Sequence, residues 1–263
     1  TVKKQKYFKY EYNFELKDDN IVIQELNKLY DNIAKKMIKY LDGRQAVIPL
    51  SGGNDSRLIA YYLIKNGYKN IIAYTYGNKR NSEIEISKKV ADFLDIEWHF
   101  VEYKNKNMQK KFNNKKTYEE MANYCGRGYS SPIVQEWEAI STLLQEKIIT
   151  KDSVVLPGYS GDFLAGTHIF DDLYNETKIE CEKLLYSIYR HQYQYSELTQ
   201  YNNNIYTKIK QCLNISNEEV FGNNKAIELF ERFDFEERQT KYITNAIRTF
   251  DYQGLQWYLP FWD

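Results

Sequence analysis

Residues 46–57 combine a short apolar run, a glycine turn and the start of a helix, and this stretch constrains the fold most strongly. The apolar run at 46–50 is typical of a buried strand. Gly52 and Gly53 then let the backbone turn sharply and approach a bound group without a Cβ in the way. The apolar residues that follow have helical spacing: Leu58, Ile59, Tyr62 and Leu63. A strand, a turn and a helix in this order aim backbone N–H groups at one point, which favours an anion site.

The same alternation of strands and helices continues along the chain. The pattern predicts strands at 70–76, 98–101 and 153–156. It predicts helices at 21–42, 57–66 and 236–252. Two further helices are predicted to begin at a capping box at 82–85 and at Ser131. Strands that alternate with helices pair in parallel through right-handed crossovers. The predicted fold class is therefore α/β, a parallel twisted sheet with helices on both faces, followed by a mostly helical C-terminal part. In such sheets, ligands bind beyond the carboxyl ends of the strands.

The chain is predicted to divide into three parts. Residues 1–20 form an extended N-terminal segment, residues 21–169 form the α/β core, and residues 170–263 form a helical part that completes the domain. The lysine-rich stretch at 103–116 is expected to be a mobile surface loop.

The composition excludes several classes of function. Basic and acidic residues number 36 each, and this neutrality argues against a nucleic-acid partner. The three cysteines form no C-x-x-C, which indicates neither a zinc site nor a disulfide framework, and the three histidines show no metal-ligand spacing. No apolar run reaches the ~20 residues that span a bilayer, and no signal peptide is visible. We therefore expect a cytoplasmic protein that has no membrane partner.

Residues 51–56 read Ser-Gly-Gly-Asn-Asp-Ser. This is neither the lysine-containing phosphate loop G-x-x-x-x-G-K-[ST] nor the dinucleotide fingerprint G-x-G-x-x-G. It resembles the PP-loop, S-G-G-x-D-S, of the ATP pyrophosphatases, with Asn54 at the variable position. The resemblance implies that the loop binds the pyrophosphate of ATP and that ATP is cleaved to AMP and pyrophosphate.

Two further motifs narrow the resemblance. A glycine-rich turn holds G-x-x-x-D at Gly158 and Asp162, and L-P-F-x-D occupies 259–263. Together with the PP-loop, these motifs resemble the synthetase domain of asparagine synthetase and its relatives, which include β-lactam synthetase and asparagine synthetase-like proteins of polysaccharide loci. The resemblance implies an ATP-dependent ligase. A small-molecule carboxylate, such as a sugar acid, is adenylated, Mg²⁺-pyrophosphate leaves, and ammonia or an amine displaces AMP.

The resemblance also implies a set of site residues, with ATP and Mg²⁺ as the cofactors. Asp55 and Asp162 match the acids of the two loops and would bind Mg²⁺, which accepts few protein ligands when phosphate and water complete its shell. The expected ATP-binding residues are Leu50, Ser51, Gly52, Gly53, Asp55, Ser56, Tyr74, Thr75 and Gly158.

The second turn departs from the asparagine-forming enzymes, in which it reads S-G-E-G-x-D-E. Pro157, Tyr159 and Phe163 stand at the serine and the two glutamates. A tyrosine at this place resembles β-lactam synthetase, in which a tyrosine and a glutamate together accept a proton. The candidate catalytic pair is therefore Tyr159 with Glu237 as its acidic partner. The alternative is that Tyr159 only lines the pocket.

Two parts of the family pattern are missing from this sequence. The family's catalytic lysine lies beyond L-P-F-x-D, and nothing matches the amino-terminal glutaminase domain. We therefore expect a trimmed chain whose nitrogen comes from a glutaminase domain or a separate ammonia source. Two other functions stay open: β-lactam synthetase-like intramolecular amide formation, and a catalytically inactive nucleotide-binding or docking domain.

Overall fold

The computed structural model describes residues 17–104, 108–109, 112–193 and 202–263, together with residues 3, 5, 8, 10 and 11. Most of the predicted extended segment at 1–20 and part of the predicted loop at 103–116 lie outside the described residues. Within the described part, no helix has both the length and the apolar character needed to cross a bilayer.

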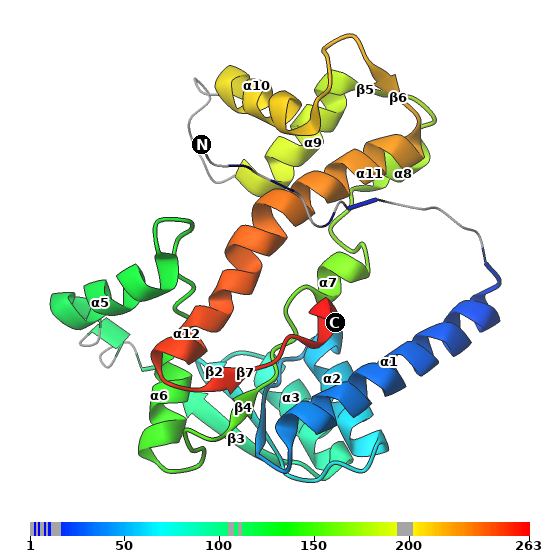
Figure 1. Ribbon diagram of the computed structural model, residues 1–263. Coiled ribbons are helices and arrows are strands. Elements are labelled where there is room, and N and C mark those ends of the chain that lie inside the picture. Colours follow the sequence, from blue (N-terminus) through cyan, green and yellow to red (C-terminus); the bar gives the residue numbers. More distant parts are fainter. Residues whose placement is uncertain are drawn as a thin grey trace. The chain divides into compact units, whose positions relative to one another are not determined.

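The centre of the fold is a five-stranded parallel sheet in the order β3-β2-β1-β4-β7 (Figure 1). The strands are β1 (Ala46–Pro49), β2 (Ile71–Gly77), β3 (Glu97–Glu102), β4 (Val154–Val155) and β7 (Gln256–Trp257). Ala46 is in register with Ile71 of β2 and with Val154 of β4, so β1 lies between them. The loops that follow β1 and β4 therefore leave the sheet side by side, at the edge where parallel strands present ligand sites.

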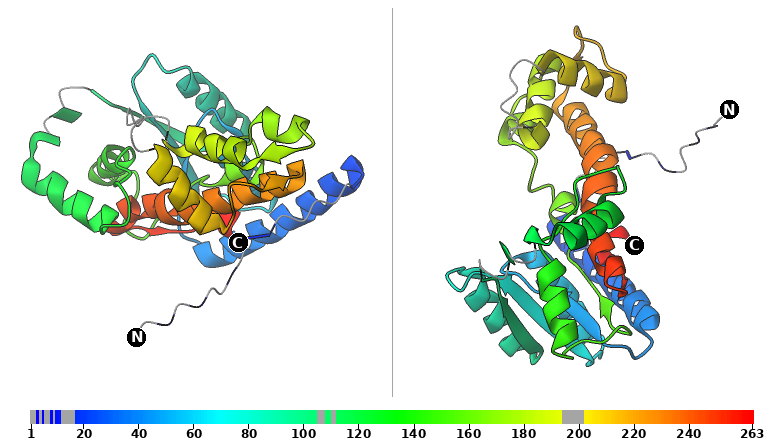
Figure 2. Two further views of the ribbon diagram at one scale, coloured as in Figure 1. Left: turned by 90° about the horizontal axis from the view of Figure 1, so that it is seen from above. Right: turned by 90° about the vertical axis from the view of Figure 1, so that its left-hand side faces the viewer.

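Helices cover both faces of this sheet (Figure 2). On one face, Ala46 and Ile48 of β1 pack in a core with α1 (Asp19–Leu41), α2 (Asn54–Lys65) and α3 (Glu83–Leu94). On the other face, Val47 packs in a core with α6 (Trp137–Gln145) and α12 (Arg248–Tyr252). Successive strand residues point to opposite faces, so this one apolar strand supplies both cores. The predicted fold class is confirmed.

A second compact unit consists of residues 1–16 and 165–241 and has its own core. Its elements are α8 (Asp171–Asn175), β5 (Ile179–Glu180), α9 (Cys181–Tyr193), α10 (Asn202–Leu213), β6 (Val220–Phe221), α11 (Asn223–Phe233) and most of the π-helix η2 (Asp234–Ile243). Leu184 of α9 and Phe230 of α11 are among its fully buried residues. We call this part the helical unit and the rest the α/β unit.

The observed division differs from the predicted one at 169/170. The α/β unit comprises residues 17–164 and also 242–263, because β7 pairs in parallel with β4 and adds the last strand to the sheet. The remaining elements of the α/β unit are α5 (Lys115–Gly126), α7 (Gly161–Leu164), η3 (Thr244–Ile247) and η4 (Pro260–Trp262).

Three predicted helices differ in detail. Ser82 precedes α3, but its side chain makes no capping hydrogen bond, so the predicted capping box does not form. Helix α6 begins at Trp137 and not at Ser131. The predicted helix at 236–252 is divided into π, 3-10 and α segments.

Candidate functional site

The first loop, between β1 and α2, is held by its two serines. The Ser51 side chain accepts a hydrogen bond from the Gly53 backbone N–H at 3.1 Å, and the Ser56 hydroxyl accepts one from the Ser51 N–H at 3.2 Å. Gly53 is the N-cap of α2 and makes no side-chain cap, so the first N–H groups of the helix are left for another partner. Together with the positive end of the helix dipole, these groups suit a phosphate.

The second loop, after β4, packs directly against the first. A Cβ placed on Gly161 would lie 2.4 Å from the Asp55 Cγ, and one on Gly158 would lie 3.0 Å from the Ser56 backbone nitrogen. Neither glycine has a positive φ, so the close approach of the two loops, and not backbone strain, requires glycine there. The structure thus brings together the PP-loop and the G-x-x-x-D turn.

Asp55 and Asp162 lie close together where the loops meet. Burial raises the pKa of the Asp55 carboxyl, the charge of Asp162 raises it further, and a hydrogen bond from the Asp162 backbone partly offsets both effects. Asp162 is exposed in the first turn of the short helix α7, and its carboxylate accepts a hydrogen bond from the Phe163 N–H at 3.0 Å. Two carboxylates that repel each other beside an anion site have the character of a divalent-cation site, and Mg²⁺ prefers such oxygen ligands.

Thr75 connects the second strand to the first loop. Its hydroxyl donates to the Leu50 carbonyl at 2.7 Å, and it also contacts the Ser87 hydroxyl at 2.8 Å. The indole N–H of Trp98 donates to the same hydroxyl at 3.0 Å. Thr75 is therefore a buried junction that fixes the end of β1, where the glycine turn begins.

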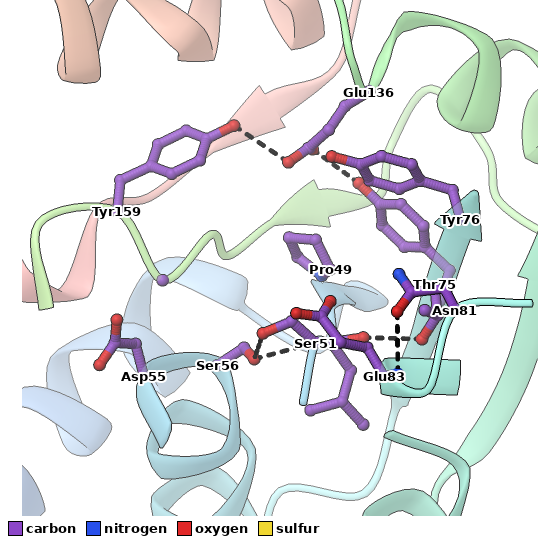
Figure 3. Close-up of a pocket in the computed structure, with 13 residues that line it drawn as sticks. Pro49, Ser51, Asp55, Ser56, Thr75, Tyr76, Asn81, Glu83, Glu136 and Tyr159 are labelled. Atoms are coloured by element: carbon purple, nitrogen blue, oxygen red, sulfur yellow. Dashed lines mark hydrogen bonds between the residues drawn. The ribbon is translucent and has the colours of Figure 1, made fainter. Parts of the chain in front are cut away.

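Glu136 belongs to this candidate site, although no motif in the sequence indicates it. It is buried, and its carboxylate accepts hydrogen bonds from the hydroxyls of Tyr159 at 3.1 Å and Tyr74 at 2.8 Å (Figure 3). Burial raises the pKa of Glu136 to about 7, although the two tyrosine hydrogen bonds lower it. Burial and the nearby Glu136 charge raise the pKa of Tyr159 well above 10. The group poised to gain or lose a proton near neutral pH is thus Glu136.

The sequence offered only a weak signal for Glu136. The predicted helix from Ser131 placed this residue on a helix, whereas it precedes the first residue of α6, Trp137. A single acid next to the apolar face of a predicted helix is ordinarily a surface residue. Its burial depends on Tyr74 and Tyr159, which come from distant parts of the sequence.

These groups surround one cavity of about 330 Å³ in the α/β unit. The two loops, the end of β2, the start of α3 and Glu136 line this cavity. Figure 3 shows Tyr159 and Glu136 pointing toward each other on one side of it. Seven of the nine predicted ATP-binding residues line this cavity: Leu50, Ser51, Asp55, Ser56, Tyr74, Thr75 and Gly158. Gly52, Gly53 and Asp162 belong to the same two loops.

The acid predicted as the partner of Tyr159 belongs to the other compact unit. Glu237 belongs to the helical unit, in π-helix η2, and its carboxylate pairs with Lys241 one turn away. The acid that Tyr159 contacts is Glu136. The prediction did not consider Glu136 because the sequence pattern placed this residue inside a helix that begins at Ser131. In the structure, Glu136 lies in the loop before α6.

Comparison with protein families gives one match to most of the chain. A family model described as asparagine synthase matches residues 36–263. The matched region includes both loops, the five strands of the sheet, Glu136 and the C-terminal motif.

Short matches connect the chain to curated proteins. It is 46% identical over 48 residues to 7-cyano-7-deazaguanine synthase of Archaeoglobus fulgidus, covering 18% of this chain and 20% of that protein. It is 39% identical over 57 residues to the protein of the same name in Microcystis aeruginosa, covering 21% and 25%. The chain therefore spans a fifth to a quarter of the length of these relatives.

Among solved structures, the chain is similar to an NH3-dependent NAD synthetase from Campylobacter jejuni, with 17% identity, a TM-score of 0.37, and coverage of 84% of this chain and 93% of that one. It is also similar to an NMN synthetase from Francisella tularensis, with 13% identity, a TM-score of 0.38, and coverage of 81% and 93%.

Proposed function

The chain belongs to the asparagine synthase family, and from this we propose that it is an ATP-dependent, AMP-forming amide ligase. The observation that carries the proposal is the convergence of two loops in the α/β unit. The PP-loop with Asp55 meets the second turn with Asp162, and Gly161 leaves no room for a Cβ between them. A helix N-terminus that suits phosphate, beside two carboxylates that suit Mg²⁺, is an arrangement that fits Mg²⁺-bound ATP.

The proposed reaction has two steps. An oxygen of the substrate carboxylate attacks the α-phosphorus of ATP, the bond to the β-phosphate oxygen breaks, and pyrophosphate leaves as an acyl-adenylate forms. A nitrogen nucleophile then attacks the acyl carbon, AMP leaves, and one proton is lost from the nitrogen. The backbone N–H groups at the start of α2 would stabilise the charge on pyrophosphate. Asp55 and Asp162 would hold Mg²⁺, which supplies further neutralisation of that charge.

We assign proton acceptance in the second step to Glu136. A general base is most effective when its pKa lies near the working pH, and the pKa of Glu136 is raised to about 7. Tyr159 donates to Glu136 and borders the same cavity, so it would orient the carboxylate and relay the proton. Glu136 takes the place that the sequence suggested for Glu237.

The substrates are proposed by chemical class alone. The acid is a small-molecule carboxylate, with a sugar acid of surface polysaccharide as one candidate. The nitrogen is ammonia, from a glutaminase domain or a separate source, or an amine. The Tyr159–Glu136 pair favours one second candidate, a β-lactam synthetase-like reaction in which the amine belongs to the same molecule as the acid.

The test separates the two half-reactions. Purified protein is mixed with ATP, Mg²⁺ and a panel of carboxylates, and the release of AMP and pyrophosphate is measured with and without ammonia, glutamine or amines. We expect AMP and pyrophosphate in equal amounts. ADP as the product would overturn the AMP-forming assignment. ATP binding without turnover under every substrate would overturn the ligase assignment and leave a nucleotide-binding or docking domain. Release that needs no added nitrogen donor and yields a cyclic amide would identify the second candidate.

Substitutions test the metal assignment in the same assay. Asp55→Asn and Asp162→Asn are each expected to slow pyrophosphate release by ~100-fold or more, because each removes a charge that holds the cation. The matched control is Asp95→Asn, since Asp95 is exposed at the left-handed C-cap of α3, where asparagine is well accepted. Normal activity in Asp55→Asn or Asp162→Asn would remove these carboxylates from the site.

A further inference from the structure

A second group of side chains of the metal-ligating types lies in the helical unit. His168, His191 and Asp234 each offer a ligand atom, and these atoms all lie within 4.8 Å of one another. We propose that these three side chains bind one divalent transition-metal ion, with Zn²⁺ the ion that their chemistry fits best. The proposal does not depend on the ATP-dependent reaction.

The three side chains come from distant segments. His168 lies between α7 and α8, His191 is near the end of α9, and Asp234 is the first residue of π-helix η2. This dispersal explains why the spacing of the histidines gave no metal signal in the sequence. π-Helical turns are rare and occur frequently at functional sites. Here the change from α-helix to π-helix takes place at the proposed ligand itself.

The existing contacts already orient these groups. A ring nitrogen of His191, Nε2, lies 3.1 Å from the Asp234 Oδ1, and Gln239 donates to Oδ2 of the same carboxylate at 2.8 Å. Nε2 of His168 lies 2.7 Å from the Glu231 Oε1. A carboxylate on one ring nitrogen of a metal-bound histidine fixes the ring and raises the basicity of the other nitrogen. Glu231 is placed to do this for His168.

The four side chains of this cluster are mostly buried, so its carboxylate charges need partners. The side chains of Asp234 and Glu231 are only 1% and 3% exposed, and those of His168 and His191 only 10% and 16%. The two imidazole rings also pack against Phe230, with centroids 5.8 and 5.5 Å away. Buried carboxylates are stable when they are paired or coordinate a metal. One divalent ion balances both negative charges without requiring either imidazole to be protonated.

The ligand types select the ion. Imidazole nitrogen is a poor ligand for Mg²⁺ and Ca²⁺, which prefer oxygen, whereas two imidazoles and a carboxylate suit Zn²⁺ with water as a fourth ligand. Such an ion would join the segment before α8, helix α9 and the start of η2 into one cross-linked structure within the helical unit.

Cobalt provides a direct test, because Co²⁺ occupies zinc sites and absorbs visible light. Untagged protein is dialysed against a chelator and then titrated with Co²⁺ and with Zn²⁺ in the absence of ATP. We expect one ion per chain, visible absorption typical of a low-coordinate Co²⁺ site, displacement by Zn²⁺ but not by excess Mg²⁺, and a higher melting temperature with the ion bound.

Substitutions locate the site. His191→Gln and His168→Gln are each expected to weaken Co²⁺ binding by more than about 100-fold, and Glu231→Gln by about 10- to 100-fold. His99→Gln is the matched control, because His99 lies in β3 and pairs with Glu97. Asp55→Asn, in the ATP site, is a second control, and both controls should keep full binding. Circular dichroism of each apo-variant establishes that it is folded.

Two results would overturn the proposal. One is the lack of stoichiometric Co²⁺ or Zn²⁺ binding by the wild-type protein. The other is binding that survives in folded His168→Gln and His191→Gln but is lost in Asp55→Asn, which would move the ion to the ATP site. Failure of the amide-ligase assay leaves this test unaffected, because the binding measurement uses no substrate.

Discussion

Glu136 is the residue whose environment differs most from that of an ordinary carboxylic acid. It is buried against two tyrosine hydroxyls, and burial raises its pKa from 4.5 to about 7. An acid with a raised pKa holds its proton in the folded protein at pH values where the unfolded chain has released it. The contribution of Glu136 to the free energy of unfolding therefore becomes less favourable as the pH rises from about 4.5 to about 7 and stays less favourable above that range.

The substitution Glu136→Gln removes this titration. Relative to wild type, the variant is expected to gain free energy of unfolding between about pH 4 and about pH 8, by up to about 3 kcal/mol. Urea denaturation at a series of pH values measures the difference. Glu146→Gln is the control, because Glu146 is exposed at the end of α6. A difference between Glu136→Gln and wild type that does not change with pH would contradict the assigned environment.

Gly161 determines how closely the two loops approach. Gly161→Ala would place a methyl carbon 2.4 Å from the Asp55 Cγ, so the Asp55 carboxylate must move. We expect pyrophosphate release to fall by ~100-fold or more, because a displacement of about 1 Å is enough for such a loss.

The control for Gly161→Ala is Gly126→Ala. Gly126 ends helix α5, and a Cβ there would come no closer than 3.8 Å to Pro132, which is ordinary contact. This variant should keep its activity and stability. Wild-type activity in Gly161→Ala would mean that the loops do not need their observed separation.

The sequence predicted that two loops meet, because a local motif describes each of them. Gly53 and Asp55 of the first loop, and Gly158 and Asp162 of the second, were predicted to meet, and the structure brings these two loops together. Glu136 was not predicted, because no short motif contains it and its role depends on burial by residues from other elements.

At the scale of elements, Thr75 joins β2 to the end of β1, to α3 and to β3. Thr75→Val keeps the shape but leaves the Leu50 carbonyl and the Trp98 N–H without their partner. The expected loss is about 1–3 kcal/mol of unfolding free energy, because buried polar groups left unpaired are costly. Chemical denaturation measures it. Thr75→Ser keeps the hydroxyl and should retain most of the stability, so equal stability of the two variants would contradict this role.

The long elements were predictable and the short ones were not. The apolar runs of β1 and β2 and the helical periodicity of α1 and α2 placed those elements within a few residues. Strand β7 has two residues, Gln256 and Trp257, and no alternation can be seen in so short a run. It forms because β4 offers an edge for pairing.

At the scale of the whole molecule, the two units have separate cores. Leu184 is fully buried in the core of the helical unit, and Leu63 is fully buried in the α/β unit. Each substitution to alanine should cost about 2–5 kcal/mol. In hydrogen-exchange mass spectrometry, Leu184→Ala should speed exchange mainly in α9 and α11, and Leu63→Ala mainly in β1 and α2. The same increase throughout the chain in both variants would show one cooperative core.

The order of units along the chain could not be predicted. The sequence placed one boundary at 169/170, whereas residues 242–263 belong to the α/β unit. A change in the residue pattern along the chain can mark the end of one unit. It does not show that a C-terminal strand pairs with a sheet formed by N-terminal residues, because that pairing joins residues far apart in the sequence.

The neighbouring positions of β1 and β4 in the sheet have a consequence for how this protein can change. Asp55 and Asp162 are far apart in the chain, yet their spacing is set by two adjacent strands and not by the length of polypeptide that joins them. Lengthening that connection costs only about 0.6 kcal/mol for each doubling of a flexible loop. Insertions or deletions in the surface connections between these strands can therefore accumulate while the two carboxylates keep their places.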